Sequence, residues 1–476
     1  MGLLRRFKDN FFLFGLGCLI WYLVRTGTKP SRAVYPCQQS AAYNANLWIA
    51  TYLTPVLGFV EYDRVRMRWK TVVLILLIGL GSYGYMSLND SDNNMTSLQL
   101  DPISASELDP SIIYAVTGTN GADDGVERLI ELMDHNDQPF YQSSKEAETQ
   151  GPTGLIGNND VVLIKVNSQW DERGGTNTDL VKSIIEALIA HPDGWKGEIV
   201  VADNGQAQYG GAGQGGSLDW MKSNAEDQTQ SIQDVVDMYA DYNASTYLWD
   251  TITTNPVQEF AEGDDEDGYV VETSVVAHTG TIVSYPKFTT PYGTQISFKY
   301  GVYKPEIEDY DVDRLKVINV PVLKTHMIYG VTGAVKHYMG VPSDKLSAGL
   351  GYRIHSAVGR GAMGTLMVQT RVPVLNIVDA IYVNVKPKDG PSTSYLDATQ
   401  VNIIAASTDP VAIDYWASKN ILCAICEANG DNTSTMDPDN TNAGEFGDWL
   451  RLSLDELNAA GYDFTIDPEK IAVYVD

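Results

Sequence analysis

The stretch RLKVINVPVLKTHMIYGVTGAVKHYMG, residues 314–340, decides the fold of this chain and locates its candidate site. It opens with a nearly continuous apolar run at residues 315–322, rich in β-branched side chains, which is typical of a strand covered on both faces. The polar residues KTH at 324–326 end that run. Two glycines then bracket a turn into the helical-looking segment GAVKHYMG at 333–340.

Ionisable side chains are concentrated in this stretch. Two lysines and two histidines fall within fourteen residues, which is dense for a chain as acidic as this one. Polar residues at the carboxyl end of a buried strand lie where open α/β sheets bind their ligands. We therefore place the candidate site here, around Lys324, His326, Lys336 and His337.

The apolar periodicity after residue 110 alternates between strand and helix patterns. Strands are expected at 112–116, 160–166, 198–202, 372–380, 401–406 and 471–475. Helices are expected at 125–134, 178–190, 232–242, 352–370, from 410, and at 445–460. This alternation predicts an α/β fold with a mostly parallel, doubly wound sheet. Alternating stretches at 270–277, 281–285 and 294–303 predict antiparallel hairpins inserted near residues 245–310.

Three apolar stretches lie in the first 88 residues, at 11–24, 47–60 and 71–86. Each is shorter than the roughly 20 residues that a straight transmembrane helix needs, so each must extend into its flanks. The third is the strongest, because VVLILLIGLG follows four basic residues in segment 64–70. We expect residues 1–88 to form a membrane anchor of two or three transmembrane helices, in contact with membrane lipid.

The basic residues of the anchor also predict its orientation. With two or with three spans, the positive-inside rule places the residues after 88 outside the cytoplasm. The expected location is therefore the cell membrane, with a polar linker at 89–108 and an extracytoplasmic α/β domain at 109–476. A cleaved signal peptide is the alternative, but no A-x-A-like site follows the first apolar stretch. In this setting four N-x-S/T sequons are candidate glycosylation sites: Asn89, Asn94, Asn243 and Asn432.

The charge of the chain restricts its partners. The formal net charge is −28, and residues 1–88 contribute ten basic against three acidic groups. The other 388 residues carry 23 basic and 58 acidic groups. Such a surface repels nucleic acid, so we expect no nucleic-acid partner. Envelope proteins or further copies of the chain remain as possible partners.

The predicted strand ends supply the candidate site residues, because the carboxyl ends of parallel strands lie side by side. Three lysines are expected to neutralise an anionic ligand and to act in catalysis: Lys165, Lys324 and Lys336. Four further residues are expected to bind the ligand: Asn167, Thr325, Thr332 and Asp414. Three more are expected to hold a divalent metal or to exchange protons: His326, His355 and Asp379. The alternative is a structural ion pair between Lys324 and Asp379, with the histidines capping helices.

The cysteine pattern gives little support to a metal or cluster site. Cys423 and Cys426 form a single C-x-x-C, which without a second pair is weak evidence for zinc. Small buried side chains or an extracytoplasmic disulfide are the alternatives. The chain has no C-x2-C-x2-C-x3-C run, which argues against a bound iron–sulfur cluster.

Several segments together resemble the uncharacterised family called domain of unknown function 362, or DUF362. They are VVLIKVN (161–167), VPVLKTH (320–326), TGAVKHYMG (332–340), VDAI (378–381), DGP (389–391) and TDPVAIDYWA (408–417). The segment RAVYPCQQSAA (32–42) also resembles a signature of membrane-linked members. The resemblance implies an α/β fold and frequent association with ferredoxin-type modules, and it supplies no established reaction. His337 stands where many relatives have Asn after the lysine of TGAVK.

Two functions follow as hypotheses. The first is a membrane-anchored extracytoplasmic domain that binds a small anionic ligand and acts as an enzyme of unknown reaction, with a divalent metal as its expected cofactor. The second is a non-catalytic subunit of the cell envelope, such as a filament or complex component. The convergence of ionisable groups favours the first, while the anchor, the sequons and the acidic surface are compatible with both.

Overall fold

The computed structural model describes residues 98–105, 110–206, 212–276, 279–347 and 354–476. The chain divides into two units, Met1–Asp92 and Asn93–Asp476, and the described residues all belong to the second. The predicted membrane segments and the sequons Asn89 and Asn94 lie outside the described residues. Within the described ranges, none of the helices combines the length and the apolar character that a membrane crossing requires.

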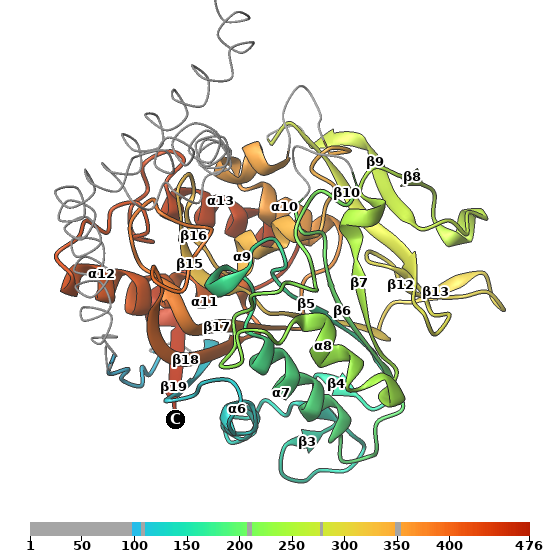
Figure 1. Cartoon of the computed structure of the whole chain (residues 1–476), viewed down its shortest axis with the longest axis horizontal. Coiled ribbons are helices and arrows are strands. Elements are labelled where there is room, and N and C mark those ends of the chain that lie inside the picture. Colours follow the sequence, from blue (N-terminus) through green and yellow to red (C-terminus); the bar gives the residue numbers. More distant parts are fainter. Residues whose placement is uncertain (1–97, 106–109, 207–211, 277–278, 348–353) are drawn as a thin grey trace, which may run out of the picture. The chain divides into compact units, whose positions relative to one another are not determined.

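A mixed sheet forms the centre of the described residues (Figure 1). Its main path is β19-β1-β18-β17-β14-β5-β6-β7, with β15 beside β17 and β16 beside β15. Neighbouring strands are parallel except where β18 meets β1 and β17, and where β16 meets β15. The strands are β1 Ser111–Thr117, β5 Val161–Lys165, β6 Glu198–Asp203, β7 Ala244–Leu248, β14 Leu315–Asn319, β15 Val322–His326, β16 Gly330–Thr332, β17 Leu375–Asn384, β18 Thr399–Ser407 and β19 Ile471–Val475.

Two hydrophobic cores cover the two faces of this sheet. Successive side chains of a strand point to opposite faces, so in β5 Val161 and Leu163 enter one core while Val162 and Ile164 enter the other. Helices α6, α7 and α8 pack in the second core, and α10, α11 and α13 pack in the first (Figure 1). Helices on both faces of a largely parallel sheet confirm the predicted mixed α/β fold.

The helices have the following bounds. The α-helices are α6 Gly125–Asp134, α7 Thr178–Ile189, α8 Ile232–Asp237, α9 Ala334–His337, α10 Ala362–Gln369, α11 Pro410–Ala417, α12 Ala424–Ala428 and α13 Phe446–Ala459. The other helical turns are η4 Glu172–Gly174, η5 Ala240–Tyr242, η6 Trp249–Ile252, η7 Phe260–Glu262, η8 Tyr338–Gly340, η9 Ile354–Arg360, η10 Ser418–Cys423 and η11 Pro468–Lys470.

A second sheet of six strands is inserted between β7 and β14, where hairpins were predicted. Its order is β13-β12-β11-β10-β9-β8, antiparallel except for the pair β8–β9. The strands are β8 Pro256–Val257, β9 Gly268–Val276, β10 Thr281–Thr289, β11 Gln295–Ser297, β12 Gly301–Lys304 and β13 Asp309–Asp311. Tyr285, Phe288 and Phe298 join this insertion to the first core. A small parallel sheet lies between α6 and β5 in the sequence, with strands β2 Tyr141–Gln142, β3 Gln150–Gly151 and β4 Ile156–Gly157.

The stretch 314–340 folds differently from the prediction in one respect. The apolar run is not a single strand, because β14 ends at Asn319 and β15 begins at Val322. Pro321 lies between them and has no N–H to donate to a sheet ladder. Residues 324–326 therefore lie inside β15 and do not follow the end of a strand, and Lys324 pairs with Thr332 of β16.

The predicted helix at 352–370 is also divided. Within its described part, η9 and α10 are separated by Gly361, whose φ of 79° is in the left-handed region. A Cβ at this position would lie 2.8 Å from the backbone and side chain of Leu452, so a larger residue fits neither the backbone conformation nor the space.

Candidate functional site

The carboxyl ends of β5 and β6 hold a buried ion pair. Lys165 ends β5 and Asp203 ends the adjacent parallel strand β6, and their Nζ and Oδ1 atoms are 2.9 Å apart. Their side chains are only 1% and 2% exposed. Nζ of Lys165 also donates to the backbone oxygens of His337, at 2.8 Å, and Val166, at 3.1 Å. This ammonium therefore makes one ion pair and two hydrogen bonds to backbone oxygens.

The pair is packed closely against the residues after α9. A Cβ at Gly340 would lie 2.1 Å from Oδ1 of Asp203 and 2.2 Å from Nζ of Lys165. Oδ2 of Asp203 accepts from the backbone and the hydroxyl of Ser168, at 2.9 and 3.0 Å. Burial lowers the pKa of Lys165, and the charge of Asp203 opposes that shift. Lys165 is thus a satisfied, structural part of the site.

Lys324 is the second buried lysine, and it lies on β15. Its Nζ donates to the backbone oxygen of Gly174, in the loop that follows β5. Its pKa is lowered to about 7, mainly by burial and next by the positive charge of Lys336, while the charge of Asp379 acts in the opposite direction. The positive charge of Lys165 also lowers the pKa of Lys324, so the two ammonium groups lie near each other.

The alternative ion pair between Lys324 and Asp379 does not form within the described residues. The carboxylate of Asp379, on β17, instead accepts from backbone N–H groups of Asn177, at 2.9 Å, and Ile381, at 3.2 Å. Burial raises the pKa of Asp379 to about 6. This carboxylate fixes the start of α7 against the sheet, because Asn177 is the N-cap residue of that helix.

Lys336 is the third buried lysine and differs from the other two. It lies on α9 with 3% of its surface exposed. Its Nζ forms no hydrogen bond or ion pair with another described residue, and it lies 5.6 Å from the centre of the Tyr329 ring. Burial lowers its pKa to about 7, with a further contribution from the charge of Lys165.

Two histidines and a tyrosine lie beside Lys336. The ring centres of His326 and His355 are 6.0 Å apart, and each is 5.3 Å from that of Tyr329. The hydroxyl of Tyr329 donates to the backbone oxygen of His355 at 2.6 Å. Burial lowers the pKa of both histidines, to about 3 for His355, and the positive charge of Lys336 lowers both further. Both rings are therefore neutral at pH 7.

The tautomer of His326 follows from its contacts. Its Nδ1 accepts from the backbone N–H groups of Ile328, at 3.1 Å, and Tyr329, at 3.2 Å. An accepting Nδ1 leaves the proton of the neutral ring on Nε2. His326 therefore caps the turn after β15, whereas the alternative interpretation expected it to cap a helix, and its Nε2 remains a donor.

The predicted metal ligands are not assembled. Among the described residues, no group of three or more His, Cys, Asp and Glu side chains could hold a metal ion. His326 and His355 are neighbours, whereas Asp379 holds the N-terminus of α7. The metal site therefore stays a prediction without structural support.

The predicted ligand-binding residues have separate positions. Asp414, on α11, caps α9 by accepting from the backbone N–H groups of Ala334 and Val335, at 2.5 and 2.9 Å. Burial raises its pKa to about 7. Gly333 permits this contact, since a Cβ there would lie 2.2 Å from Oδ1 of Asp414. Asp414 thus has a structural role at α9, and its predicted role in ligand binding stays a prediction.

Thr325 and Thr332 lie on the hairpin β15–β16. The hydroxyl of Thr325 donates to the backbone oxygen of Lys386 at 2.8 Å, which ties the hairpin to the chain after β17. The hydroxyl of Thr332 is buried without a hydrogen-bond partner in the part of the chain that the structure describes. Thr332 is thus the one of the two whose hydroxyl is available to another group.

Asn167 borders a small cavity beside the loop that holds Lys324. Its Oδ1 atom and Nε1 of Trp170 are both buried without hydrogen-bond partners among the described residues. Both residues line this cavity of about 10 Å³. That volume suits about one water molecule, which would satisfy both atoms.

Two residues of this region carried no usable signal in the sequence, and for a third the partner could not be predicted. Tyr329 follows β15 and is one of many aromatic residues in the chain, and Asn319 is the polar residue that ends β14. Neither pattern indicates a site. Asn319 binds Nδ1 of His337 through its Oδ1 atom at 2.7 Å. Asp203 is recognisable in the sequence as the polar end of a buried strand. Its pairing with Lys165 could not be predicted, because it depends on β5 and β6 being neighbours in the sheet.

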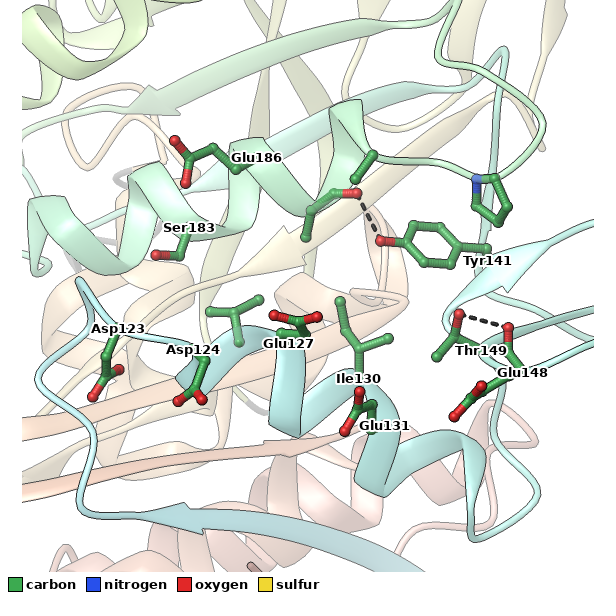
Figure 2. Close-up of a pocket in the computed structure, with 14 residues that line it drawn as sticks. Asp123, Asp124, Glu127, Ile130, Glu131, Tyr141, Glu148, Thr149, Ser183 and Glu186 are labelled. Atoms are coloured by element: carbon green, nitrogen blue, oxygen red, sulfur yellow. Dashed lines mark hydrogen bonds between the residues drawn. The ribbon is translucent and has the colours of Figure 1, made fainter.

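A larger cavity of about 550 Å³ lies away from the lysines, between α6 and α7 (Figure 2). Figure 2 shows Glu127 and Glu131 on α6 facing Ser183 and Glu186 on α7, with Tyr141 at one end. The hydroxyl of Tyr141 donates to the backbone oxygen of Ala187 at 2.8 Å. None of the predicted site residues lines this cavity, and its carboxylates would repel an anion.

Two remaining predictions concern residues outside the lysine region. Cys423 and Cys426 are free and buried, so the small-side-chain interpretation holds and the disulfide does not. The described sequons, Asn243 and Asn432, are both exposed. Exposure is required for glycosylation, which stays a prediction at all four sequons.

Comparisons with known proteins identify one family. The family model described as a domain of unknown function, DUF362, matches residues 232–419. The matched segment contains Lys324, Lys336 and Asp379, while Lys165 and Asp203 precede it. No curated protein and no solved structure matches the chain. The resemblance seen in the motifs is confirmed for residues 232–419, the part of the chain that the DUF362 family model matches.

Proposed function

We propose that this domain binds a small anion, a carboxylate or a phosphate, at Lys324 and Lys336. The observation that carries the proposal is the buried side chain of Lys336, whose Nζ has no acidic partner among the described residues. A buried ammonium without a counter-charge is costly, so it either loses its proton or gains an anion. Asp203 is already occupied by Lys165, and Asp379 by backbone N–H groups.

Stability alone does not explain why two lysines are buried at positions 324 and 336. Apolar residues of similar volume at positions 324 and 336 would avoid the cost of desolvating two ammonium groups. A purely structural envelope subunit, the second hypothesis, would gain from such a replacement. Perturbed ionisable groups that serve no structural purpose are typical of functional sites.

The proposal includes the setting of the domain. Residues 1–88 would anchor the chain in a membrane, as their three apolar stretches suggest, and residues 109–476 would lie outside the cytoplasm. The exposed sequons Asn243 and Asn432 are compatible with that location. A metal is left out of the proposal, because the predicted ligands are not grouped within the described residues.

Thermal unfolding of the full-length protein tests the proposal. Acetate and inorganic phosphate are titrated at constant ionic strength, because a ligand that binds only the native state raises the melting temperature saturably. We expect the increase in the wild type and in Lys196→Met, and its loss in Lys336→Met. Lys196 is a matched control, since it is exposed. An equal anion-dependent increase in melting temperature in Lys336→Met and in the wild type would refute the proposal.

A further inference from the structure

We propose that Lys336 is a nucleophile that forms a Schiff base with the carbonyl carbon of a small 2-oxo acid. This inference rests on the proposed function, because the carboxylate of such a substrate is the anion that the site would bind. It adds a reaction type and a substrate class to the binding of an anion. The argument depends on which of the three buried lysines has a free amine.

The three lysines differ in what their amines contact. Lys165 uses its N–H groups on Asp203 and on two backbone oxygens. Lys324 donates to the backbone oxygen of Gly174. Lys336 makes no hydrogen bond or ion pair with a described residue. Lys336 is therefore the amine whose lone pair can be directed at a substrate.

The surroundings of Lys336 favour the neutral amine. Its side chain is buried. The positive charge of Lys165 lowers its pKa, and its own positive charge lowers the pKa of Lys324. A desolvated lysine near another cationic group is the arrangement that activates an amine as a nucleophile. Lys324 remains to pair with the carboxylate of a 2-oxo acid, next to the carbonyl that Lys336 attacks.

Schiff-base formation also needs proton carriers, and the neighbouring rings can supply them. Nε2 of His326 carries the proton of the neutral ring, because its Nδ1 accepts two backbone N–H groups. The ring of His355 makes no hydrogen bond with a described residue, and this residue is only partly buried. The group of His326, Tyr329 and His355 thus links Lys336 to the surface.

The reaction balances without any further reagent. The nitrogen of the neutral Lys336 amine forms a bond with the carbonyl carbon, and the carbonyl oxygen takes a proton from one of the histidines. The nitrogen returns one proton to that histidine and passes its second proton to the new hydroxyl group as the C–O bond breaks, so that one water molecule leaves. The product is an imine between the lysine nitrogen and the former carbonyl carbon. No electron is gained or lost by the protein.

Trapping with pyruvate tests the inference. Full-length protein is treated with pyruvate and sodium cyanoborohydride, which reduces an imine to a stable secondary amine, and the modified residue is located by peptide mass spectrometry. We expect a carboxyethyl group on Lys336 in the wild type and in Lys196→Met. It should be lost in Lys336→Met and in Lys336→Arg, since a guanidinium keeps the charge but forms no imine.

The melting temperature in pyruvate separates the two proposals. A pyruvate-dependent increase without an adduct on Lys336 would overturn the Schiff base and leave anion binding in place. Adducts found only on lysines other than Lys336 would also overturn the Schiff base. If pyruvate neither raises the melting temperature nor forms an adduct, both proposals are overturned. An adduct on Lys336 that forms more readily as the pH rises through 7 would support the nucleophile.

Discussion

Replacing Lys336 with Met should stabilise the protein at neutral pH. The native fold buries this ammonium without an acidic partner, while the unfolded chain hydrates it fully. Met has a similar length and no charge, so it should fill the same space. The groups that act on Lys336 are the positive charge of Lys165 and the aromatic ring of Tyr329.

The size of the effect follows from the pKa. Its fall from 10.5 to about 7 corresponds to about 5 kcal/mol between the two protonation states, at about 1.4 kcal/mol for each tenfold change in proton affinity. This value is an upper bound, because the side chain can give up its proton or find water. Replacements of buried charges by apolar residues have stabilised proteins by about 1–4 kcal/mol, and we expect a gain in that range.

The dependence on pH has a definite sign. Below pH 7 the amine is protonated in both states, and the full cost of burial is present. Between pH 7 and 10.5 the unfolded chain binds a proton that the native protein lacks, so the stability of the wild type rises with pH. The advantage of Lys336→Met should therefore be largest below pH 7 and shrink towards pH 10.5.

Urea unfolding followed by tryptophan fluorescence measures this difference, and Trp249 and Trp449 are both fully buried. The control is Lys196→Met, which removes an exposed lysine and should change the unfolding free energy by less than about 0.5 kcal/mol. A Lys336→Met protein that is less stable than the wild type below pH 7 would refute the reasoning. A stability difference that does not vary with pH would also refute it.

Three other single variants and one double variant test the packing around the lysines. Asp203→Ala should lower the unfolding free energy by about 3–5 kcal/mol, because it leaves Lys165 buried without its carboxylate. Combining it with Lys165→Met should recover much of that loss in urea unfolding, and no recovery would contradict the pairing. Gly333→Ala should cost about 1–3 kcal/mol through the clash of its Cβ with Asp414, and an unchanged melting temperature would argue against that contact. Asp414→Ala should speed hydrogen exchange at the amide of Ala334, which loses its acceptor, and unchanged exchange would exclude the cap.

Much of the fold could be predicted because its signals are local. The amphipathic pattern at 125–134 and the apolar run at 471–475 coincide with α6 and β19 as the structure has them. The direction of β18 could not be predicted, because the period of a strand is the same in parallel and antiparallel sheets. The pairing of β1 with β19 joins residues more than 350 positions apart, and no local pattern encodes it.

The candidate site could be predicted only in part. Lys165 ends a buried strand, and such ends meet at one edge of a parallel sheet, so its nearness to the other lysines follows from the fold class. The acceptor for Lys324 is the backbone of Gly174, and the path of that loop has no periodic signal. Asp414 was predicted to bind the ligand, but its contact with the start of α9, which uses both of its oxygens, has no signal in the sequence.

The predicted membrane anchor, residues 1–88, lies outside the residues that the structure describes. Its apolar stretches predict it, and the charge difference between residues 1–88 and the rest of the chain agrees with a distinct environment. Carbonate extraction of membranes from cells that produce the full-length protein would test it. Release of the chain into the soluble fraction would contradict an integral anchor.

Proton uptake on anion binding tests the central claim most directly. Acetate is titrated calorimetrically into the full-length protein at a pH above 7, in two buffers that differ in ionisation enthalpy. Lys324 and Lys336 are then mostly neutral in the free protein, and a bound anion should return protons to them. We predict a binding heat that depends on the buffer and reports net proton uptake, and that is absent in the double variant Lys324→Met, Lys336→Met. Binding without proton uptake, or equal binding by the double variant, would contradict the account.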